Sequence, residues 1–242
     1  MDFTVRIADK NIAVTSIYDQ VKVLCRDYLT EQAADFSVTV SPEDIAREHK
    51  QNRREAEIER IREVEYPESY LETLAVYRKI VVQMLEYDTF LMHGAVVAEG
   101  ERAWLFTAHS GTGKTTHIRL WLDNIEGSYV VNGDKPLIRI GEQITVFGTP
   151  WSGKEGMNKN IGMKLCGIVL LERGAENRIN ALSFSEALPT LIQQSYRPKD
   201  KQQLSKTLAL IGKLSGRVPM YRLQCNMLPD AAFTAYSVLS GE

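Results

Sequence analysis

The sequence predicts an α/β protein in which a mixed sheet with helices follows a small α+β unit at the N-terminus. Three observations carry this prediction. Beyond residue 89, short apolar runs alternate with helical patterns, as they do in folds that pack helices onto a sheet. One of these runs, Ala103–Thr107, leads directly into a glycine-rich loop and then a helix. Ahead of residue 89, short strands precede two long helices, one of them highly charged. We therefore expect one region at 1–88 and a second at 89–242.

The elements of the first region follow from local patterns. Phe3–Ile7 and Asn11–Thr15 are predicted strands around a short turn, and Asp35–Val40 alternates as a third. Ser41-Pro42 places a capping residue and a first-turn proline at the start of a helix that runs to about residue 65. Mixed Arg and Glu residues predict that this helix is solvated, with a partner-docking surface as the alternative. A second helix with a wide apolar face is expected over Glu68–Asp88.

The second region is expected to hold most of the sheet. Phe90–Ala98 and Ala103–Thr107 are predicted to form a hairpin around a charged turn. The other predicted strands are Ser128–Val131, Leu137–Ile140, Ile144–Phe147, Cys166–Leu171 and Val218–Cys225. The predicted helices are Lys114–Ile125, a helix from the capping box Ser183-x-x-Glu186 to about Tyr196, Lys201–Ser215 and Pro229–Leu239.

Composition excludes several classes of protein. The chain has 242 residues, 44% of them hydrophobic, and a formal net charge of −2, so it can build a core but lacks the basic field of a non-specific nucleic-acid binder. The N-terminus has no basic region followed by an apolar run, and no stretch of about 18 apolar residues occurs. Three scattered cysteines share no metal-ligand spacing. We expect a cytoplasmic protein with free thiols and neither a nucleic-acid nor a membrane partner.

The clearest motif is the stretch Ala-His-Ser-Gly-Thr-Gly-Lys-Thr-Thr at residues 108–116. It fits a Walker A phosphate loop, with Ala108 where the commonest pattern has its first glycine. Glycines let backbone N–H groups curl around an anion, and the helix that follows adds its N-terminal dipole. Lys114 would reach the outer phosphates of ATP, and the Thr115 hydroxyl would join a Mg²⁺ shell. The predicted nucleotide-binding residues are Ser110, Gly111, Thr112, Gly113, Lys114, Thr115 and Thr116.

Three further features could take part in chemistry. Asp134 follows a predicted strand, where a carboxylate could meet a metal ion or an attacking hydroxyl, although Asn-Gly-Asp is also a good turn sequence. His93 lies beside apolar residues, a setting in which structural histidines are the commoner kind. The loop Gly148–Asn158 could be a mobile lid that brings the Lys154 ammonium to a transferring phosphate. A plain surface loop is the alternative, but it would not need Trp151.

The order of these motifs resembles a known superfamily. His93-Gly94-Ala95-Val96-Val97, then the loop to Thr116, then Asn132-Gly133-Asp134 resembles the HPr kinase/phosphorylase and phosphoenolpyruvate carboxykinase superfamily. The stretch Gly148–Lys154 is similar to a loop of the HPr-kinase-like proteins of unassigned substrate. The resemblance spans Phe90–Leu171 and implies a P-loop kinase core. It implies that Asp134 is the general base and that His93 lies near the phosphates.

The resemblance has limits that shape the functional prediction. HPr kinases carry two adjacent acids where this chain has Gly133-Asp134, so Glu155 is a rival second metal ligand beside Thr115 and Asp134. Glu172-Arg173-Gly174 echoes the HPr kinase signature outside its expected place, so the resemblance does not extend to HPr as acceptor.

The expected activity is ATP- and Mg²⁺-dependent phosphoryl transfer to a hydroxyl of a small protein, a peptide or a metabolite. The alternative is a nucleotide-responsive binding module without transfer. Phosphoenolpyruvate carboxykinase activity is less favoured, because the chain is short for that enzyme. The sequence leaves open whether GTP or pyrophosphate replaces ATP, and whether the chain forms a homo-oligomer.

Overall fold

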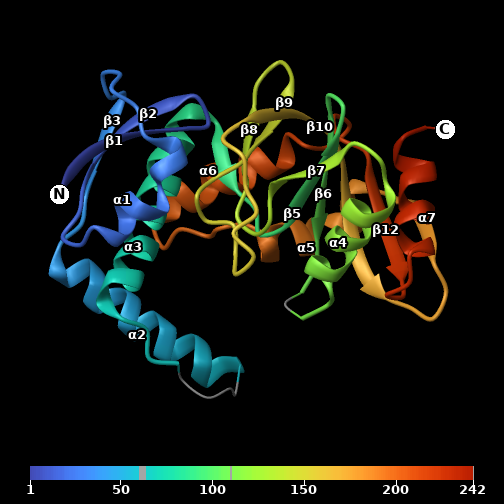
Figure 1. Cartoon of the computed structure of the whole chain (residues 1–242), viewed down its shortest axis with the longest axis horizontal. Helices are drawn as coiled ribbons and strands as arrows, with labels where there is room; N and C mark the ends of the chain where they lie inside the picture. The colour runs from blue at the N-terminus through green and yellow to red at the C-terminus, as the bar shows by residue number, and fades with distance from the viewer. Residues whose placement is uncertain (60–63, 110, 242) are drawn as a thin grey trace. The chain divides into compact units, whose positions relative to one another are not determined.

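The computed structural model describes residues 1–59, 64–109 and 111–241 (Figure 1). The chain divides into two compact units, Met1–Gln83 and Met84–Glu242, and each is described by itself. The division of function between regions 1–88 and 89–242 stays a prediction. In the described ranges, no helix is both long enough and apolar enough to cross a membrane.

The first unit combines a three-stranded sheet with helices. Its strands are β1 (Asp2–Ile7), β2 (Lys10–Thr15) and β3 (Phe36–Thr39). They lie in the order β1-β2-β3, with an antiparallel first pair and a parallel second pair. The helices are α1 (Gln20–Leu24), the 3-10 turn η1 (Arg26–Tyr28), α2 (Pro42–Glu59) and α3 (Glu68–Met84). The three predicted strands are confirmed, whereas α1 and η1 were not predicted from the sequence.

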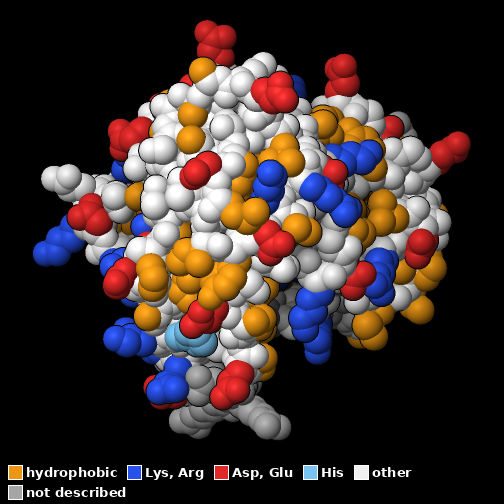
Figure 2. All heavy atoms as spheres, turned by 60° about the vertical axis from the view of Figure 1, so that its left-hand side comes forward, with side chains coloured by type: hydrophobic (Ala, Val, Ile, Leu, Met, Phe, Trp, Pro, Cys, Tyr) orange, Lys and Arg blue, Asp and Glu red, His pale blue; other side chains and the backbone are white. Residues whose placement is uncertain are grey.

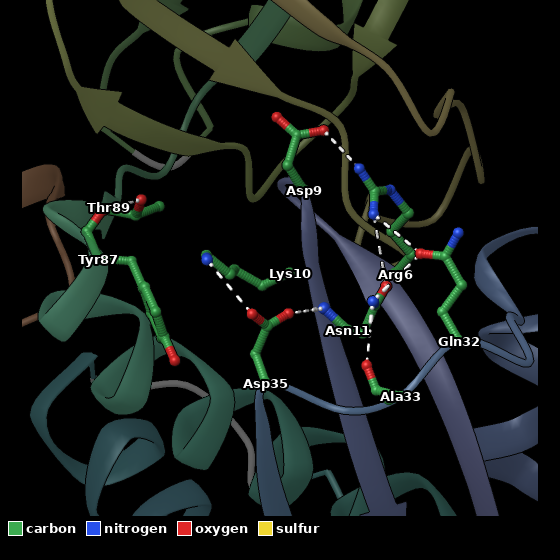
Figure 3. Close-up of polar contacts among 9 residues, drawn as sticks. All are labelled: Arg6, Asp9, Lys10, Asn11, Gln32, Ala33, Asp35, Tyr87 and Thr89. Atoms are coloured by element: carbon green, nitrogen blue, oxygen red, sulfur yellow. Dashed lines mark hydrogen bonds and ion pairs between the residues drawn. The ribbon is translucent and has the colours of Figure 1, made fainter.

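The register of this small sheet is fixed by polar contacts around the β1–β2 turn (Figure 3). Ala8 and Asp9 take positive φ angles of 48° and 58° in that turn. The Asp35 carboxylate accepts the Asn11 N–H at 2.8 Å and lies 3.4 Å from the Lys10 ammonium. The backbone hydrogen bond from Asn11 is the largest cause that lowers the pKa of Asp35. The carboxylate therefore ties β2 to the residue just ahead of β3.

Helix α2 is less solvated than its composition suggests. Asp44 and Glu48 are buried, and their carboxylates pair with Lys79 at 2.7 Å and with Arg78 at 2.8 Å on α3. The prediction of a fully solvated helix was therefore wrong for this face, because ion pairs pack it on α3. On the face shown in Figure 2, acidic and basic side chains are interspersed, with no large patch of a single sign.

Helix α3 ends earlier than predicted. The expected helix over Glu68–Asp88 stops at Met84 and gives way to the 3-10 turn η2 (Leu85–Tyr87). Asp88 then takes a left-handed conformation with φ 49°, which no α-helix continues through.

The second unit is built on a nine-stranded mixed sheet. Its strands are β4 (Thr89–Leu91), β5 (Ala95–Glu99), β6 (Arg102–Thr107), β7 (Ser128–Asn132), β8 (Leu137–Ile140), β9 (Ile144–Phe147), β10 (Gly162–Arg173), β11 (Arg178–Leu182) and β12 (Met220–Cys225). They follow the order β4-β8-β9-β10-β6-β5-β7, and β12 joins β10 to β11. The long strand β10 is parallel to both β6 and β12, so it lies at the centre of the sheet.

Helices cover both faces of this sheet. They are α4 (Lys114–Asn124), α5 (Phe184–Gln194), α6 (Lys201–Gly212) and α7 (Asp230–Leu239). Leu105 of β6 packs in one cluster with residues of α5 and α6, whereas its neighbours Trp104 and Phe106 pack with α4 and α7. Burial on both faces explains why the predicted strands are continuous apolar runs.

The hairpin predicted ahead of the glycine-rich loop is confirmed between β5 and β6, but its first strand is shorter than predicted. The run Phe90–Ala98 forms two strands, β4 and β5, that pair with β8 and β6 respectively. The predicted strand is interrupted at His93 because the backbone there bonds to other segments. The His93 N–H donates to Gln194 O at 2.7 Å, and the Gly94 N–H donates to Asp134 O at 2.9 Å. His93 therefore lies between β4 and β5, at the end of the sheet where β6 also ends.

Candidate functional site

Two glycines of the loop between β6 and α4 have backbone angles that favour glycine. Gly111 and Gly113 take φ angles of 76° and 115°, which residues with a Cβ rarely adopt. A Cβ at either position would meet no atom within 4 Å, so backbone conformation, not crowding, requires these glycines. Ala108 is buried and is not among the described residues with positive φ, so alanine there introduces no strain. Ser110 lies outside the described residues.

Lys114, the first residue of α4, is directed back over this loop. Its ammonium donates to Ala108 O at 3.0 Å. Burial holds the pKa of Lys114 below its usual value, although the nearby charge of Asp134 works to raise it. Thr115 is exposed and Thr116 half-buried at the start of the same helix. His109 is also exposed, and its carbonyl accepts hydrogen bonds from the Thr112 hydroxyl and N–H.

The carboxylate of Asp134 is held on both sides. Oδ1 lies 2.9 Å from Nε2 of His93, and Oδ2 accepts a hydrogen bond from the Lys135 ammonium. Burial of Asp134 works to raise its pKa, but the hydrogen bond from His93 and the charge of Lys135 outweigh it and lower the pKa to about 2. Asp134 is therefore ionised at neutral pH, with its side chain 21% exposed.

Asn132, and not Asp134, makes the turn after β7. Its side-chain oxygen accepts the N–H of Asp134 at 2.9 Å and that of Lys135 at 2.7 Å. Its amide donates to Thr149 O at 3.0 Å, and the whole residue is buried. Since Asn132 accepts the hydrogen bonds that close this turn, the Asp134 carboxylate is not needed for them, which argues against a role limited to the turn.

His93 is fixed from three directions. Its Nδ1 lies 2.9 Å from Oε1 of Gln194 at the end of α5, while Nε2 faces Asp134. Its carbonyl accepts the Thr107 hydroxyl at 2.8 Å, one residue before Ala108. The next residue, Gly94, packs closely against the backbone of β6, since a Cβ there would lie 2.8 Å from Phe106 O. The His–Asp pair is thus anchored to the strand that leads into the phosphate loop.

The loop 148–160 has a buried base and an exposed tip. Gly148, Thr149, Trp151 and Ser152 are buried, whereas the tip 153–156 is exposed throughout. A Cβ at Gly148 would lie 1.9 Å from Lys159 O and 2.5 Å from Val131 O, so the base fits directly against β7. A mobile lid over Gly148–Asn158 stays a prediction, and the tight packing of the base favours movement of the exposed tip.

The tip carries the predicted residues Lys154 and Glu155. Both are exposed, and Gly153 ahead of them packs close to Asp134, since a Cβ at Gly153 would lie 3.2 Å from Asp134 Cβ. Glu155 pairs with Arg119 of α4 at 2.5 Å. The tip is thus joined to the helix that follows the phosphate loop.

The described residues hold no group of three or more His, Cys, Asp or Glu side chains suited to a metal ion. Mg²⁺ in nucleotide sites usually takes one or two protein oxygens and completes its shell with phosphate and water. The Thr115 hydroxyl and the Asp134 carboxylate supply oxygens of that kind, so the site fits a nucleotide-borne Mg²⁺. Glu155 could add a ligand only if its pair with Arg119 opens.

His117, on the helix that follows the loop, has a structural role. His117 of α4 is 2% exposed, and its Nε2 accepts the Trp121 indole N–H at 3.1 Å. Burial lowers the pKa of His117 to about 4. Cys25, Cys166 and Cys225 are free thiols, as expected.

Three side chains of the site were not among the predicted site residues. Lys135 and Asn132 adjoin Asp134, and the Asn-Gly-Asp-Lys sequence itself could have indicated them. Gln194 lies far along the chain, and only the fold brings it to His93.

Comparison with known proteins finds a distant structural similarity. No protein-family model matches the chain, and no curated protein matches it. Among solved structures, the Hpr(Ser) kinase/phosphatase from Coxiella burnetii matches with a TM-score of 0.36 at 10% identity, covering 63% of this chain and 99% of that one. Similarity at this level does not identify a family, and the function must be argued from the side chains of the site.

Proposed function

We propose that the chain is an ATP- and Mg²⁺-dependent phosphotransferase that moves the γ-phosphoryl group of ATP to a hydroxyl of a small protein, a peptide or a metabolite. The kinase core is β6, the phosphate loop and α4, with the neighbouring strands. The loop amides and Lys114 hold the phosphates, and Asp134 accepts the hydroxyl proton. His93 orients Asp134, and Lys154 stabilises charge on the transferring group. ATP as donor agrees with the cytoplasmic location expected from the sequence.

The observation that carries the proposal is the setting of the Asp134 carboxylate. It is ionised, its charge acts on Lys114, and His93 and Lys135 fix its two oxygens. Phosphoryl transfer needs chiefly positioned groups and charge stabilisation, with a carboxylate to receive the hydroxyl proton. These side chains supply that set beside a loop whose glycines have the conformation of a phosphate cradle.

Mg²⁺ would be held by the Thr115 hydroxyl and Asp134, and when bound it would neutralise charge on the outer phosphates. The Lys135 ammonium, which donates to Asp134, would then share this carboxylate with the metal. Glu155 stays a proposed second ligand.

A second candidate function is a nucleotide-responsive binding module. The ion pair between Glu155 and Arg119 favours it, because that pair couples the exposed tip to the helix that begins at Lys114. Nucleotide on the loop could change the tip and so a partner surface, without transfer.

Turnover separates the two functions. The chain is incubated with γ-labelled ATP, Mg²⁺ and peptide and small-molecule fractions of cells that contain it, and ADP and labelled products are counted. The kinase makes ADP and a labelled acceptor in equal amounts, and Lys114→Ala abolishes both. Nucleotide binding without label transfer in any fraction supports the module, and parallel assays with GTP and pyrophosphate identify the donor.

A further inference from the structure

The central strand β10 extends past the end of β6. Leu170 pairs with Thr107, the last residue of β6, and β10 continues to Arg173. Successive side chains of a strand alternate between the faces of a sheet. Val169 and Leu171 lie in the cluster packed by α4 and α7, so Arg173 emerges on that same face, beside the loop that leaves β6.

Arg173 there contacts the phosphate loop directly. Its Nε donates to Thr112 O at 3.2 Å, and its Nη2 donates to Gly111 O at 2.5 Å. A guanidinium presents its donors in a rigid planar fork that matches two neighbouring carbonyls, whereas an ammonium is a compact charge whose donors rotate.

The carbonyls that Arg173 holds determine where the loop amides point. In a trans peptide, the C=O of one residue and the N–H of the next point in opposite directions. With Thr112 O turned to Arg173, the Gly113 N–H points away from it. With Gly111 O turned the same way, the Thr112 N–H points inward and closes a turn on His109 O at 3.3 Å.

We infer that Arg173 is a positioning residue for nucleotide phosphates: from β10 it turns the carbonyls of Gly111 and Thr112 outward, so that the Thr112 amide closes the turn on His109 and the Gly113 amide faces the anion. The inference rests on the proposed nucleotide site and adds a residue to it. Arg173 acts through the loop backbone and does not contact phosphate. Its contribution is therefore the same for every nucleotide whose β-phosphate lies on the loop, whether or not a γ-phosphate is present.

Two variants and a matched control test the inference. Arg173→Gln removes the charge and the fork, Arg173→Lys keeps the charge and loses the fork, and Arg178→Gln neutralises an exposed arginine of β11 that pairs with Glu176. Affinities for ADP and for a non-hydrolysable ATP analogue are measured by calorimetry. Arg173→Gln should weaken both by about tenfold, the scale of lost charge-assisted hydrogen bonds at a solvent-accessible site. Arg173→Lys should fall between it and the wild type, and Arg178→Gln should match the wild type.

Hydrogen exchange without nucleotide supplies the second measurement. The amides of Gly111 to Lys114 should exchange faster in Arg173→Gln than in the wild type, while the thermal midpoint moves by less than about 2 °C, as for other surface changes. Loss of affinity for the ATP analogue alone would overturn the inference, because it would indicate contact with the γ-phosphate. Unchanged exchange, or wild-type affinity in Arg173→Gln, would overturn it too.

The same data separate this inference from the proposed function. If the wild type binds neither nucleotide, the proposed function fails and the phosphate role of Arg173 fails with it. If the wild type binds both and Arg173→Gln binds equally well, only the role of Arg173 fails.

Discussion

His93 and Asp134 contact each other through Nε2 and Oδ1 at 2.9 Å, and the register of the sheet brings them together. His93 stands just ahead of β5, and Asp134 just after β7. These strands are antiparallel neighbours in which Val96 lies opposite Asn132, so the start of one meets the end of the other. Thr107, at the end of β6, bonds to His93 at this same edge. The pair is therefore a product of topology, and it lies where the phosphate loop begins.

Lys114→Ala should lose nucleotide affinity and keep its fold. The ammonium is half-buried over the loop, and removing such a contact to phosphate costs about 2–5 kcal/mol by analogy with buried charge pairs. Calorimetric titration with ATP and Mg²⁺ measures it, with the exposed Lys199→Ala as control. Wild-type affinity in Lys114→Ala would refute the phosphate loop.

Nucleotide should protect the tip 153–156 from hydrogen exchange more than it protects the loop base. The tip is exposed and is tied to α4 through the Glu155–Arg119 pair, whereas Gly148–Ser152 is packed already. Exchange is compared with and without a non-hydrolysable ATP analogue. Equal protection of the tip in both states would count against any lid.

Acid should destabilise the fold through His117. Its pKa is about 4 in the folded chain and about 6.5 when unfolded, so the unfolded chain gains a proton first as pH falls. Stability that is full above pH 6.5 is lost between about pH 6.5 and pH 4, by up to about 3 kcal/mol. Urea unfolding across this range measures it. His117→Gln should flatten this part of the profile, and an unchanged slope in that variant would show that other groups cause it.

Gly148→Ala should destabilise the second unit by about 1–3 kcal/mol or more, because a Cβ there meets backbone oxygens that have no room to move. Gly212→Ala is the matched control. It lies at the end of α6 with nothing within 4 Å of an added Cβ, so alanine there should be neutral or slightly stabilising. Thermal midpoints of the two variants decide it, and equal midpoints would contradict the packing argument.

Much of the fold could be predicted from the sequence because apolar periodicity, caps and turn residues are local signals. The strands flanking the phosphate loop, the helix after it and the capping box at Ser183 are all confirmed. Strand β11 was missed because its side chains are mostly exposed and give no apolar pattern. The single predicted run Phe90–Ala98 failed because its break at His93 depends on bonds to distant segments.

Some residues of the candidate site could likewise be predicted from the sequence, and others could not. The loop glycines and Lys114 belong to one contiguous motif, and Gly111 and Gly113 have positive φ angles. The sequence could not show that the turn is made by the side chain of Asn132 and not by that of Asp134, since both residues suit turns. Gln194 beside His93, and Arg173 beside Gly111, depend on tertiary structure that local patterns do not encode.

The most direct test of the proposed function is the rate of γ-phosphoryl transfer by Asp134→Asn in a single-turnover assay with an acceptor found as described above. The substitution keeps size and turn propensity and removes the charge. ATP should still bind, because the loop amides and Lys114 remain, while transfer should fall by about 10²–10⁴, the usual contribution of a general base. If Asp134 acts mainly on the metal, ATP affinity in Mg²⁺ falls as well and added metal partly restores the rate. Transfer at the wild-type rate in Asp134→Asn would contradict the account, because it would leave the site without its base.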